Sequence, residues 1–259
     1  MKTQLITFLS CVVFVSTSLA QPTPATKPQT SPASNGWEFS VTPYLWALGI
    51  TGSVSHDGTQ LGRVKLSPGD VLSDLKMGAM GVIEARHGRL GLYVDAMYGD
   101  LGKSASRTMD QVSLAANTSI KVGLLTVAPS YTLVRSEAVV LDGLIGARFM
   151  WQNASSTITA TQFGESITKS SSVQVNGAVV GLKGRFNIGQ SDYFVPFYVD
   201  VGPTEKSGLT SQAYLGIGRA FGWGDISLVA KNVYYQFKPN SLSTDLNMFG
   251  LAVGVTFRF

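Results

Sequence analysis

The chain has 259 residues, of which 44% are hydrophobic and 14% are charged, with 28 glycines and a formal net charge of +4. Soluble proteins carry about 25% charged residues, so this chain is poor in charge. It is too apolar to be intrinsically disordered, and its small net charge argues against nucleic acid as a partner.

The first twenty residues have the pattern of a secretory signal peptide. A positive start at Lys2 is followed by a short apolar run over 5–15 and by a small-residue cleavage site ending at Ala20. We therefore expect residues 1–20 to be removed, and with them Cys11, the only cysteine. Residues 21–36 contain four prolines and are predicted to form an extended periplasmic linker.

From Trp37 onward, large apolar residues alternate with polar or small ones, which is the period of a β-strand. The alternation is clearest between 249 and 259. We predict about ten strands, within a range of about eight to twelve. They are placed near 37–51, 77–86, 90–101, 118–134, 138–151, 174–187, 192–202, 209–221, 225–238 and 246–259.

The connections between these strands favour a membrane barrel. Tight turns alternate along the chain with longer loops at 52–76, 102–117, 152–173, 203–208 and 239–245. Outer-membrane barrels have short periplasmic turns, long external loops and an even number of strands. Aromatic residues near strand ends, including Trp37, Tyr44, Trp46 and Trp223, are predicted to form interfacial girdles. The sequence therefore predicts a closed antiparallel transmembrane β-barrel over 37–259 in the cell outer membrane of a Gram-negative bacterium, with a secreted soluble β protein as the alternative.

Several segments point to a family. The opening segment 37–47 reads WEFSVTPYLWA, and 84–89, 95–98 and 142–148 add further similarity. These segments resemble an uncharacterised bacterial family of outer-membrane β-barrel proteins. The ending, with Gly254, Phe257 and Phe259, is similar to the C-terminal signal read by the barrel-assembly machinery. The resemblance implies the fold and the outer-membrane location, and it implies no activity.

The first long loop, 52–76, is predicted to contain a hairpin followed by a short helix. Ser67 suits the N-cap, Pro68 the first helical position, and Asp70 the first turn, where the helix dipole favours an acid. The apolar residues between 71 and 75 form a short stripe. We expect this helix to fold over or into the barrel mouth and leave the lumen narrow or occluded. A mobile loop is the alternative.

Alternation places a set of charged residues on the inward face of the strands. A Lys or Arg facing lipid at the membrane midplane costs about 2–4 kcal/mol, which favours this placement. The set comprises Glu84, Arg86, Asp95, Asp142, Arg148, Lys183, Arg185, Asp200 and Arg258, with Lys231 less certain because the alternation of its strand slips in phase. These charges would line a weakly selective aqueous lumen or form a salt-bridged network that fills a narrow barrel. The network is favoured because about eight strands leave an interior only just filled by side chains.

Signals for chemistry are scarce. The two histidines, His56 and His87, are expected at opposite ends of the barrel, and His56 beside Asp57 is explained by loop polarity. We expect no enzyme activity, no metal and no cofactor. The predicted function is a structural or small porin-like role, with outer-membrane lipid and the assembly machinery as partners. The alternative is a surface binding or adhesion module acting through loops 52–76 and 152–173, with an unknown ligand.

Overall fold

The computed structural model describes residues 36–56, 59–109, 112–160, 165–238 and 242–259. The predicted signal peptide lies outside the described residues, as do the predicted linker apart from Gly36 and the loop residue Asp57.

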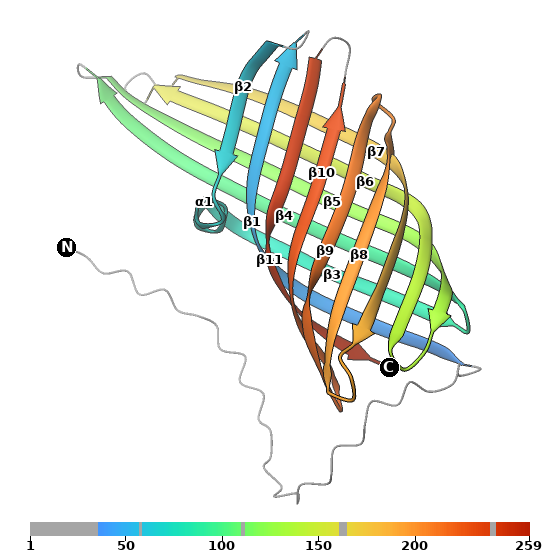
Figure 1. Cartoon of the computed structure of the whole chain (residues 1–259). Helices are drawn as coiled ribbons and strands as arrows, with labels where there is room; N and C mark the ends of the chain where they lie inside the picture. Colours follow the sequence, from blue (N-terminus) through green and yellow to red (C-terminus); the bar gives the residue numbers. More distant parts are fainter. Residues whose placement is uncertain (1–35, 57–58, 110–111, 161–164, 239–241) are drawn as a thin grey trace, which may run out of the picture.

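The described part of the chain is almost entirely β-strand. Its elements are β1 (Trp37–His56), β2 (Thr59–Leu66), α1 (Pro68–Asp74), β3 (Leu75–His87), β4 (Leu90–Met109), β5 (Val112–Arg135), β6 (Val139–Ala160), β7 (Glu165–Asn187), β8 (Tyr193–Thr204), β9 (Gly208–Phe221), β10 (Gly224–Phe237) and β11 (Leu242–Arg258). Every strand pair is antiparallel, and β11 pairs with β1, so β1 and β3–β11 close into a ring of ten strands (Figure 1). The predicted fold class, a closed antiparallel barrel with a short helix after the first strand, is confirmed.

Side chains alternate between the outside and the inside of this ring. On β1, for example, Leu45 is 82% exposed whereas the next residue, Trp46, is 4% exposed. The outer face is apolar on strands all around the barrel, with exposed Ile83, Leu92, Leu133, Ile145, Val180, Val199, Leu215, Leu228 and Leu251 among others. A continuous apolar belt on a closed antiparallel barrel is the surface that a lipid bilayer solvates.

The ends of the barrel differ. At one end, here called the turn end, short turns join the strands, and Gly88 and Gly189 adopt the left-handed φ of +60° and +57° that two of these turns require. Aromatic rings stack on the outer surface at this end, with Phe221 and Trp223 5.6 Å apart. The predicted girdle position of Trp46 and Tyr44 is wrong, because both lie on the inward face of β1.

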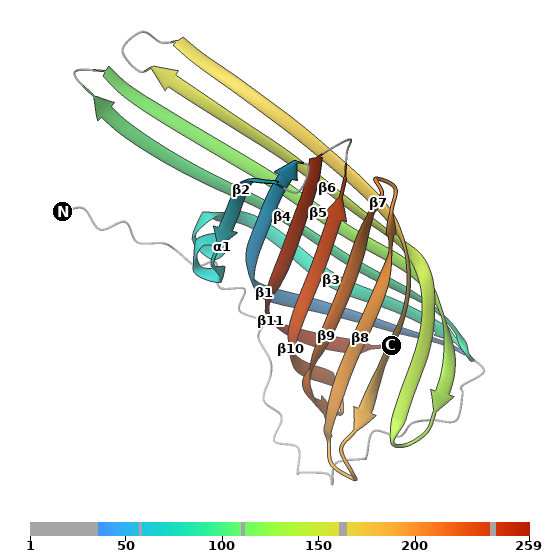
Figure 2. The ribbon, with the colours of Figure 1, turned by 45° about the horizontal axis from the view of Figure 1, so that its top comes forward.

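At the opposite end, here called the loop end, β4, β5, β6 and β7 continue their pairing and extend far beyond the other strands (Figure 2). We call the extension formed by residues 102–109, 112–120, 152–160 and 165–173 the blade. The predicted loops 102–117 and 152–173 are therefore wrong, since β4–β5 and β6–β7 continue as paired hairpins. Ser and Thr are frequent here on both faces, so the apolar–polar alternation that marks a half-buried strand is absent.

The wall of the barrel is interrupted at one place. β1 and β3 pair only between Trp37↔His87 and Pro43↔Gly81. Beyond Pro43, β1 has no partner on that side until Ile50, where β2 begins to pair. We call this interruption, between residues 44–49 of β1 and 75–80 of β3, the seam. The helix α1 lies beside it (Figures 1 and 2).

Candidate functional site

The barrel interior has a charged level toward the turn end and an apolar level toward the loop end. The charged level contains every residue that alternation placed inside. Asp95, Asp142, Arg148, Lys183 and Asp200 are buried. Glu84, Arg86, Arg185 and Arg258 are partly exposed near the turn end.

The first cluster is centred on Asp95 of β4. Its carboxylate accepts hydrogen bonds from Lys231 Nζ at 2.8 Å, Tyr44 Oη at 2.8 Å and Gln212 Nε2 at 3.1 Å. Gln212 is on β9, which is five positions from β4 in the ten-strand ring. This hydrogen bond therefore joins opposite walls of the barrel across the lumen.

The second cluster is an ion pair between Arg148 of β6 and Asp200 of β8, and both side chains have no exposed surface. The remaining guanidinium donors are used as well. Arg148 Nε donates to Thr126 Oγ1 at 3.0 Å and Nη1 donates to Thr210 Oγ1 at 3.2 Å. The second oxygen of Asp200 accepts from the backbone N–H of Gln212 at 2.9 Å. A buried charge pair is tolerated only when its remaining polar atoms are satisfied in this way.

The third cluster connects four strands, β3, β5, β6 and β7. Arg86 of β3 binds Asp142 of β6 through two parallel hydrogen bonds of 2.6 and 3.0 Å. Lys183 of β7 lies 3.3 Å from the same carboxylate and also pairs with Glu84. Thr132 Oγ1 donates to Asp142 at 2.7 Å. The cluster thus alternates acid and base and leaves no large excess of either charge.

The fourth cluster lies nearest the turn end. Asp225 pairs with both Arg258 and Arg185, and the guanidinium of Arg185 stacks on the ring of Phe194 at 3.8 Å. A cavity of about 250 Å³ lies between the third and fourth clusters. Because acids and bases both line it, it has no strong preference for the charge of a solute.

The sequence interpretation missed some of these partners. Alternation does not place Asp225 in the interior and leaves Lys231 uncertain. The structure gives β10 one uninterrupted phase, in which both residues point inward. The apparent slip came from polar residues on its outer face near the loop end, where Tyr234 Oη donates to Asp245 at 2.6 Å. The spacing of Asp225 and Lys231 by an even number of residues was the signal available.

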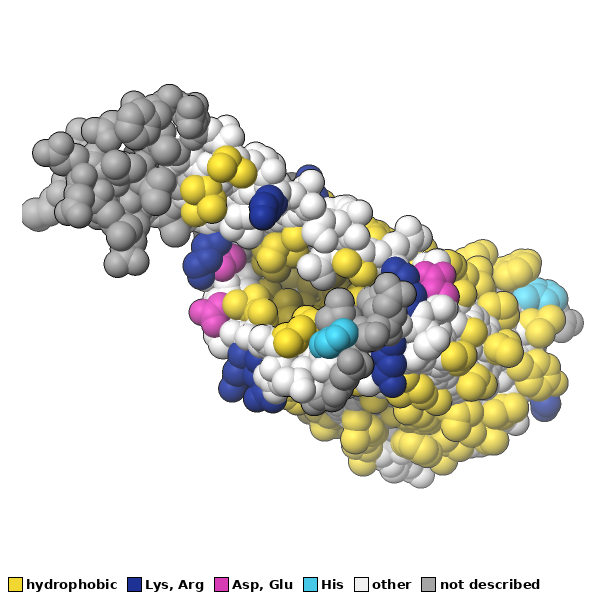
Figure 3. All heavy atoms as spheres, turned by 90° about the horizontal axis from the view of Figure 1, so that it is seen from above, with side chains coloured by type: hydrophobic (Ala, Val, Ile, Leu, Met, Phe, Trp, Pro, Cys, Tyr) yellow, Lys and Arg dark blue, Asp and Glu magenta, His cyan; other side chains and the backbone are white. Residues whose placement is uncertain are grey.

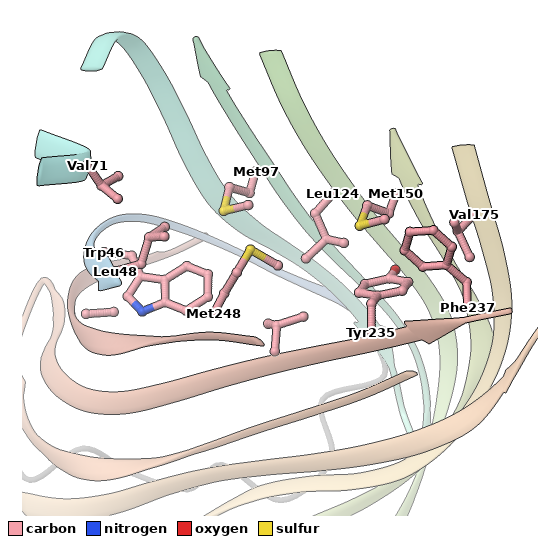
Figure 4. Close-up of a cluster of buried hydrophobic side chains, with 12 residues drawn as sticks. Trp46, Leu48, Val71, Met97, Leu124, Met150, Val175, Tyr235, Phe237 and Met248 are labelled. Carbon is pink, nitrogen blue, oxygen red and sulfur yellow. The ribbon is translucent and has the colours of Figure 1, made fainter. Parts of the chain in front are cut away.

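The apolar level, here called the apolar chamber, was also missed. It comprises the buried side chains of Trp46, Leu48, Val71, Met97, Leu124, Met150, Val175, Val233, Tyr235, Phe237, Met248 and Ala252. They converge on the interior from α1 and from strands around the ring (Figure 4). Seen from the loop end, apolar side chains line a hollow at the centre, with charged side chains around its rim (Figure 3). Alternation predicts only the charged residues of the interior and does not predict an apolar level above them.

α1 covers one side of the apolar chamber. Ser67 caps the helix and Asp70 completes a capping box, with Ser67 Oγ donating to the Asp70 carboxylate at 2.7 Å. These hydrogen bonds hold the pKa of Asp70 below its usual value. Val71 is buried in the chamber, and Asp74 forms an ion pair of 3.4 Å with Lys103 of β4. The helix therefore connects β1 and β4 across the seam.

The histidines do not form a site with each other. His56 is the last residue of β1, opposite Leu242, whereas His87 packs against Trp37 at the turn end with ring centroids 5.3 Å apart. In the described ranges, no group of three or more His, Cys, Asp or Glu residues is arranged to hold a metal ion. No helix in the same part of the chain is long and apolar enough to span a membrane.

No protein-family model and no curated protein sequence matches the chain. Among solved structures it is similar to the attachment invasion locus protein Ail of Yersinia pestis, with 16% identity, coverage of 86% of this chain and 100% of Ail, and a TM-score of 0.33. It is similar to the translocator domain of autotransporter NalP from Neisseria meningitidis, with 14% identity, 87% and 89% coverage and a TM-score of 0.41. The transport unit of autotransporter AIDA-I from Escherichia coli matches with 9% identity, 89% and 93% coverage and a TM-score of 0.37.

These likenesses concern the fold alone. The closed ring of ten strands and its apolar belt place the chain among transmembrane barrels. The protein is an outer-membrane β-barrel.

Proposed function

We propose that the protein is a non-enzymatic outer-membrane barrel with an occluded lumen and a structural role in the membrane, and that it is not an open porin. The observation that supports this most directly is the bond between Gln212 and Asp95, which crosses the full width of the ring. Lys231 reinforces it from a third strand. We also propose that the turn end faces the periplasm and that Gly254, Phe257 and Phe259 are read by the barrel-assembly machinery.

The energetics of the interior favour an occluded lumen. A water channel at this level would have to separate Asp95 from Lys231 and from Gln212. Leaving one member of a buried ion pair without its partner costs about 3–5 kcal/mol, so separating Asp95 from Lys231 is unfavourable. The charged clusters therefore hold the lumen shut rather than select ions.

Conductance in planar lipid bilayers tests this proposal. The wild-type protein is expected to insert without steady current steps. The triple variant Asp95→Ala/Gln212→Ala/Lys231→Ala removes the cross-lumen cluster and is expected to conduct. A matched control, Asp74→Ala/Lys103→Ala, removes an ion pair outside the lumen and is expected to stay closed. A large, steady wild-type conductance would reject the proposal.

A second candidate function, surface binding, is favoured by the blade. Its outer strands have unpaired edges, because pairing of β3 with β4 stops at Leu101 and pairing of β8 with β7 stops at Gly177. Unpaired edges and hydroxyl-rich faces provide donors and acceptors for an extended partner. β2 in the loop 52–76 adds another exposed strand.

Shortening the blade tests this alternative. Deleting 104–117 and 154–171 removes both hairpin ends in register and leaves the ring intact. If the blade is the binding element, cells displaying the shortened protein lose adhesion to immobilised matrix proteins that cells with the full protein bind. Equal adhesion by the two kinds of cell would exclude the blade as the binding surface.

A further inference from the structure

The seam opens within the part of the barrel that faces lipid. Residues 45, 47 and 49 of β1 lie opposite Val253, Leu251 and Phe249 of β11, whose side chains are all exposed on the apolar belt. At about 3.3 Å per residue, the interruption runs roughly 15–20 Å along the strands. Unpaired backbone groups in lipid cost several kcal/mol each, so a gap here is expensive unless another element covers it.

α1 is the element that covers the seam. It contacts β1 on one side and β4 on the other, and the carbonyl of Leu66 and the ring of Pro68 lie so close to Gly49 that a Cβ there would be at 3.1 and 3.3 Å. Val71 points from the helix into the apolar chamber, whereas its neighbour Leu72 is exposed. A seven-residue helix is too short to be stable alone, so its position depends on these few contacts.

Two buried side-chain polar atoms of the apolar chamber have no hydrogen-bond partner among the described residues, Trp46 Nε1 and Tyr235 Oη. Trp46 is 4% exposed, and its Nε1 has no hydrogen-bond acceptor among the described residues. The Trp46 ring lies at the junction of the two levels, since Lys231 Nζ is 5.3 Å from its centroid. A buried N–H without an acceptor costs free energy that a bound acceptor would recover.

We propose that the apolar chamber binds a small apolar molecule carrying an oxygen acceptor, and that this molecule exchanges with the bilayer through the seam when α1 moves aside. The lining selects an apolar ligand, Trp46 Nε1 donates to its oxygen, and the charged level below stops it from continuing to the turn end. The exposed Leu45 and Met77 on the two sides of the seam give the route an apolar entrance. Binding above the charged level does not depend on whether the lumen conducts.

Tryptophan quenching tests the site. The chain has four tryptophans, and Trp37→Phe/Trp151→Phe/Trp223→Phe leaves Trp46 as the only one. A matched variant retains only Trp223, which is exposed on the outer surface. In vesicles, 4-bromoanisole should quench Trp46 saturably, and at a mole fraction at least tenfold lower than it quenches Trp223. 4-Bromotoluene, of similar size but without an acceptor, should require several-fold more. Equal dependence for the two tryptophans would overturn the site, and equal potency of the two compounds would overturn the role of Nε1.

Two sources of ligand are separated by a lipid arm. If the ligand is a free small molecule, phosphatidylcholine with brominated acyl chains should quench the fluorescence of Trp223 and leave the fluorescence of Trp46 unquenched. Strong quenching of Trp46 by this lipid, with no further effect of 4-bromoanisole, would show that an acyl chain fills the chamber and would overturn the assignment to a free molecule.

The chamber side of α1 is tested by a pair of neighbouring substitutions. Val71→Asp places a carboxylate in the chamber and should weaken 4-bromoanisole binding at least tenfold. Leu72→Asp places the same charge on the exposed side and should change binding less than twofold. Equal effects of the two would contradict the placement of the ligand beneath the helix.

Cross-linking after folding tests the route. In the variant Asp74→Cys/Lys103→Cys, a short bismaleimide cross-link ties α1 to β4. The cross-link should slow the onset of Trp46 quenching by 4-bromoanisole at least tenfold and leave the final extent of quenching unchanged. The control Lys121→Cys/Asn153→Cys joins paired residues of β5 and β6, far from the seam, and should leave the onset unchanged. An unchanged onset in the first variant would show that the ligand enters from the loop end and would overturn the seam as the route.

Discussion

Replacing Asp95 with Asn is expected to destabilise the barrel strongly, because it leaves the ammonium of Lys231 buried without a counter-charge. The two side chains are 4% and 5% exposed, and Lys231 Nζ is left with uncharged acceptors only, the new amide oxygen and Tyr44 Oη at 3.0 Å. Removing one member of a buried pair costs about 3–5 kcal/mol. The folded-to-unfolded ratio should therefore fall by about 100-fold or more.

The double variant Asp95→Asn/Lys231→Met separates loss of the charge partner from loss of shape. A buried pair replaced by uncharged groups of similar volume is often no less stable than the original, so the double variant should recover most of the loss. The free energy of unfolding is measured by urea titration in lipid vesicles, with folded and unfolded forms distinguished by gel mobility without heating. Asp74→Asn, which breaks an exposed pair with Lys103, serves as control and should cost less than about 1 kcal/mol. If Asp95→Asn costs no more than the control, or the double variant is as unstable as the single, the lumen at this level contains water and the reasoning is wrong.

Three further outcomes are expected. Deleting Phe259, whose backbone exchanges hydrogen bonds of 2.9 and 3.2 Å with Phe39, should slow formation of the heat-modifiable form several-fold in pulse-chase experiments, and a normal rate would argue against an assembly signal. Ser67→Ala removes a helix cap worth about 0.5–2 kcal/mol and should speed hydrogen exchange in α1 by about 2- to 30-fold. In the unaltered protein, the pKa of Asp70 is lowered in the folded state, so the stabilisation that Asp70 gives α1 is complete above its unfolded pKa of about 3.9 and is lost as pH falls through the lower folded value. Hydrogen exchange in α1, corrected for its intrinsic rate, should therefore stay constant from about pH 8 to 5 and rise only below about pH 4. Arg148→Lys leaves hydroxyl partners unbonded and should cost about 1–3 kcal/mol by urea titration, whereas wild-type stability would show that a point charge suffices.

The sequence contained most of the barrel because one physical pattern repeats along it. A strand with lipid outside and packed side chains inside must alternate, and the run from Phe249 to Phe257 does so without a break. The capping signals of α1 were also local, and Ser67, Pro68 and Asp70 occupy the positions that their chemistry predicts.

The blade was not predictable by the same rule, because its strands have water on both faces and no apolar stripe. Nor could alternation identify which inward residues meet across the lumen. Asp95 and Gln212 are 117 residues apart in the chain, and their contact depends on how the ring closes. Likewise, Trp46 resembled an interfacial aromatic until the register of β1 with β11 placed it inside.

The short pairing of β1 with β3 has a mechanical consequence. A ring held by hydrogen-bond ladders gives way first at its shortest ladder. The pairing of β1 with β3 ends at Pro43, whereas β1 pairs with β11 from Ser40 to His56. Under force or heat the barrel should open between β1 and β3. β1 then stays hydrogen-bonded to β11, so the first and last strands remain paired while the ring opens into a sheet.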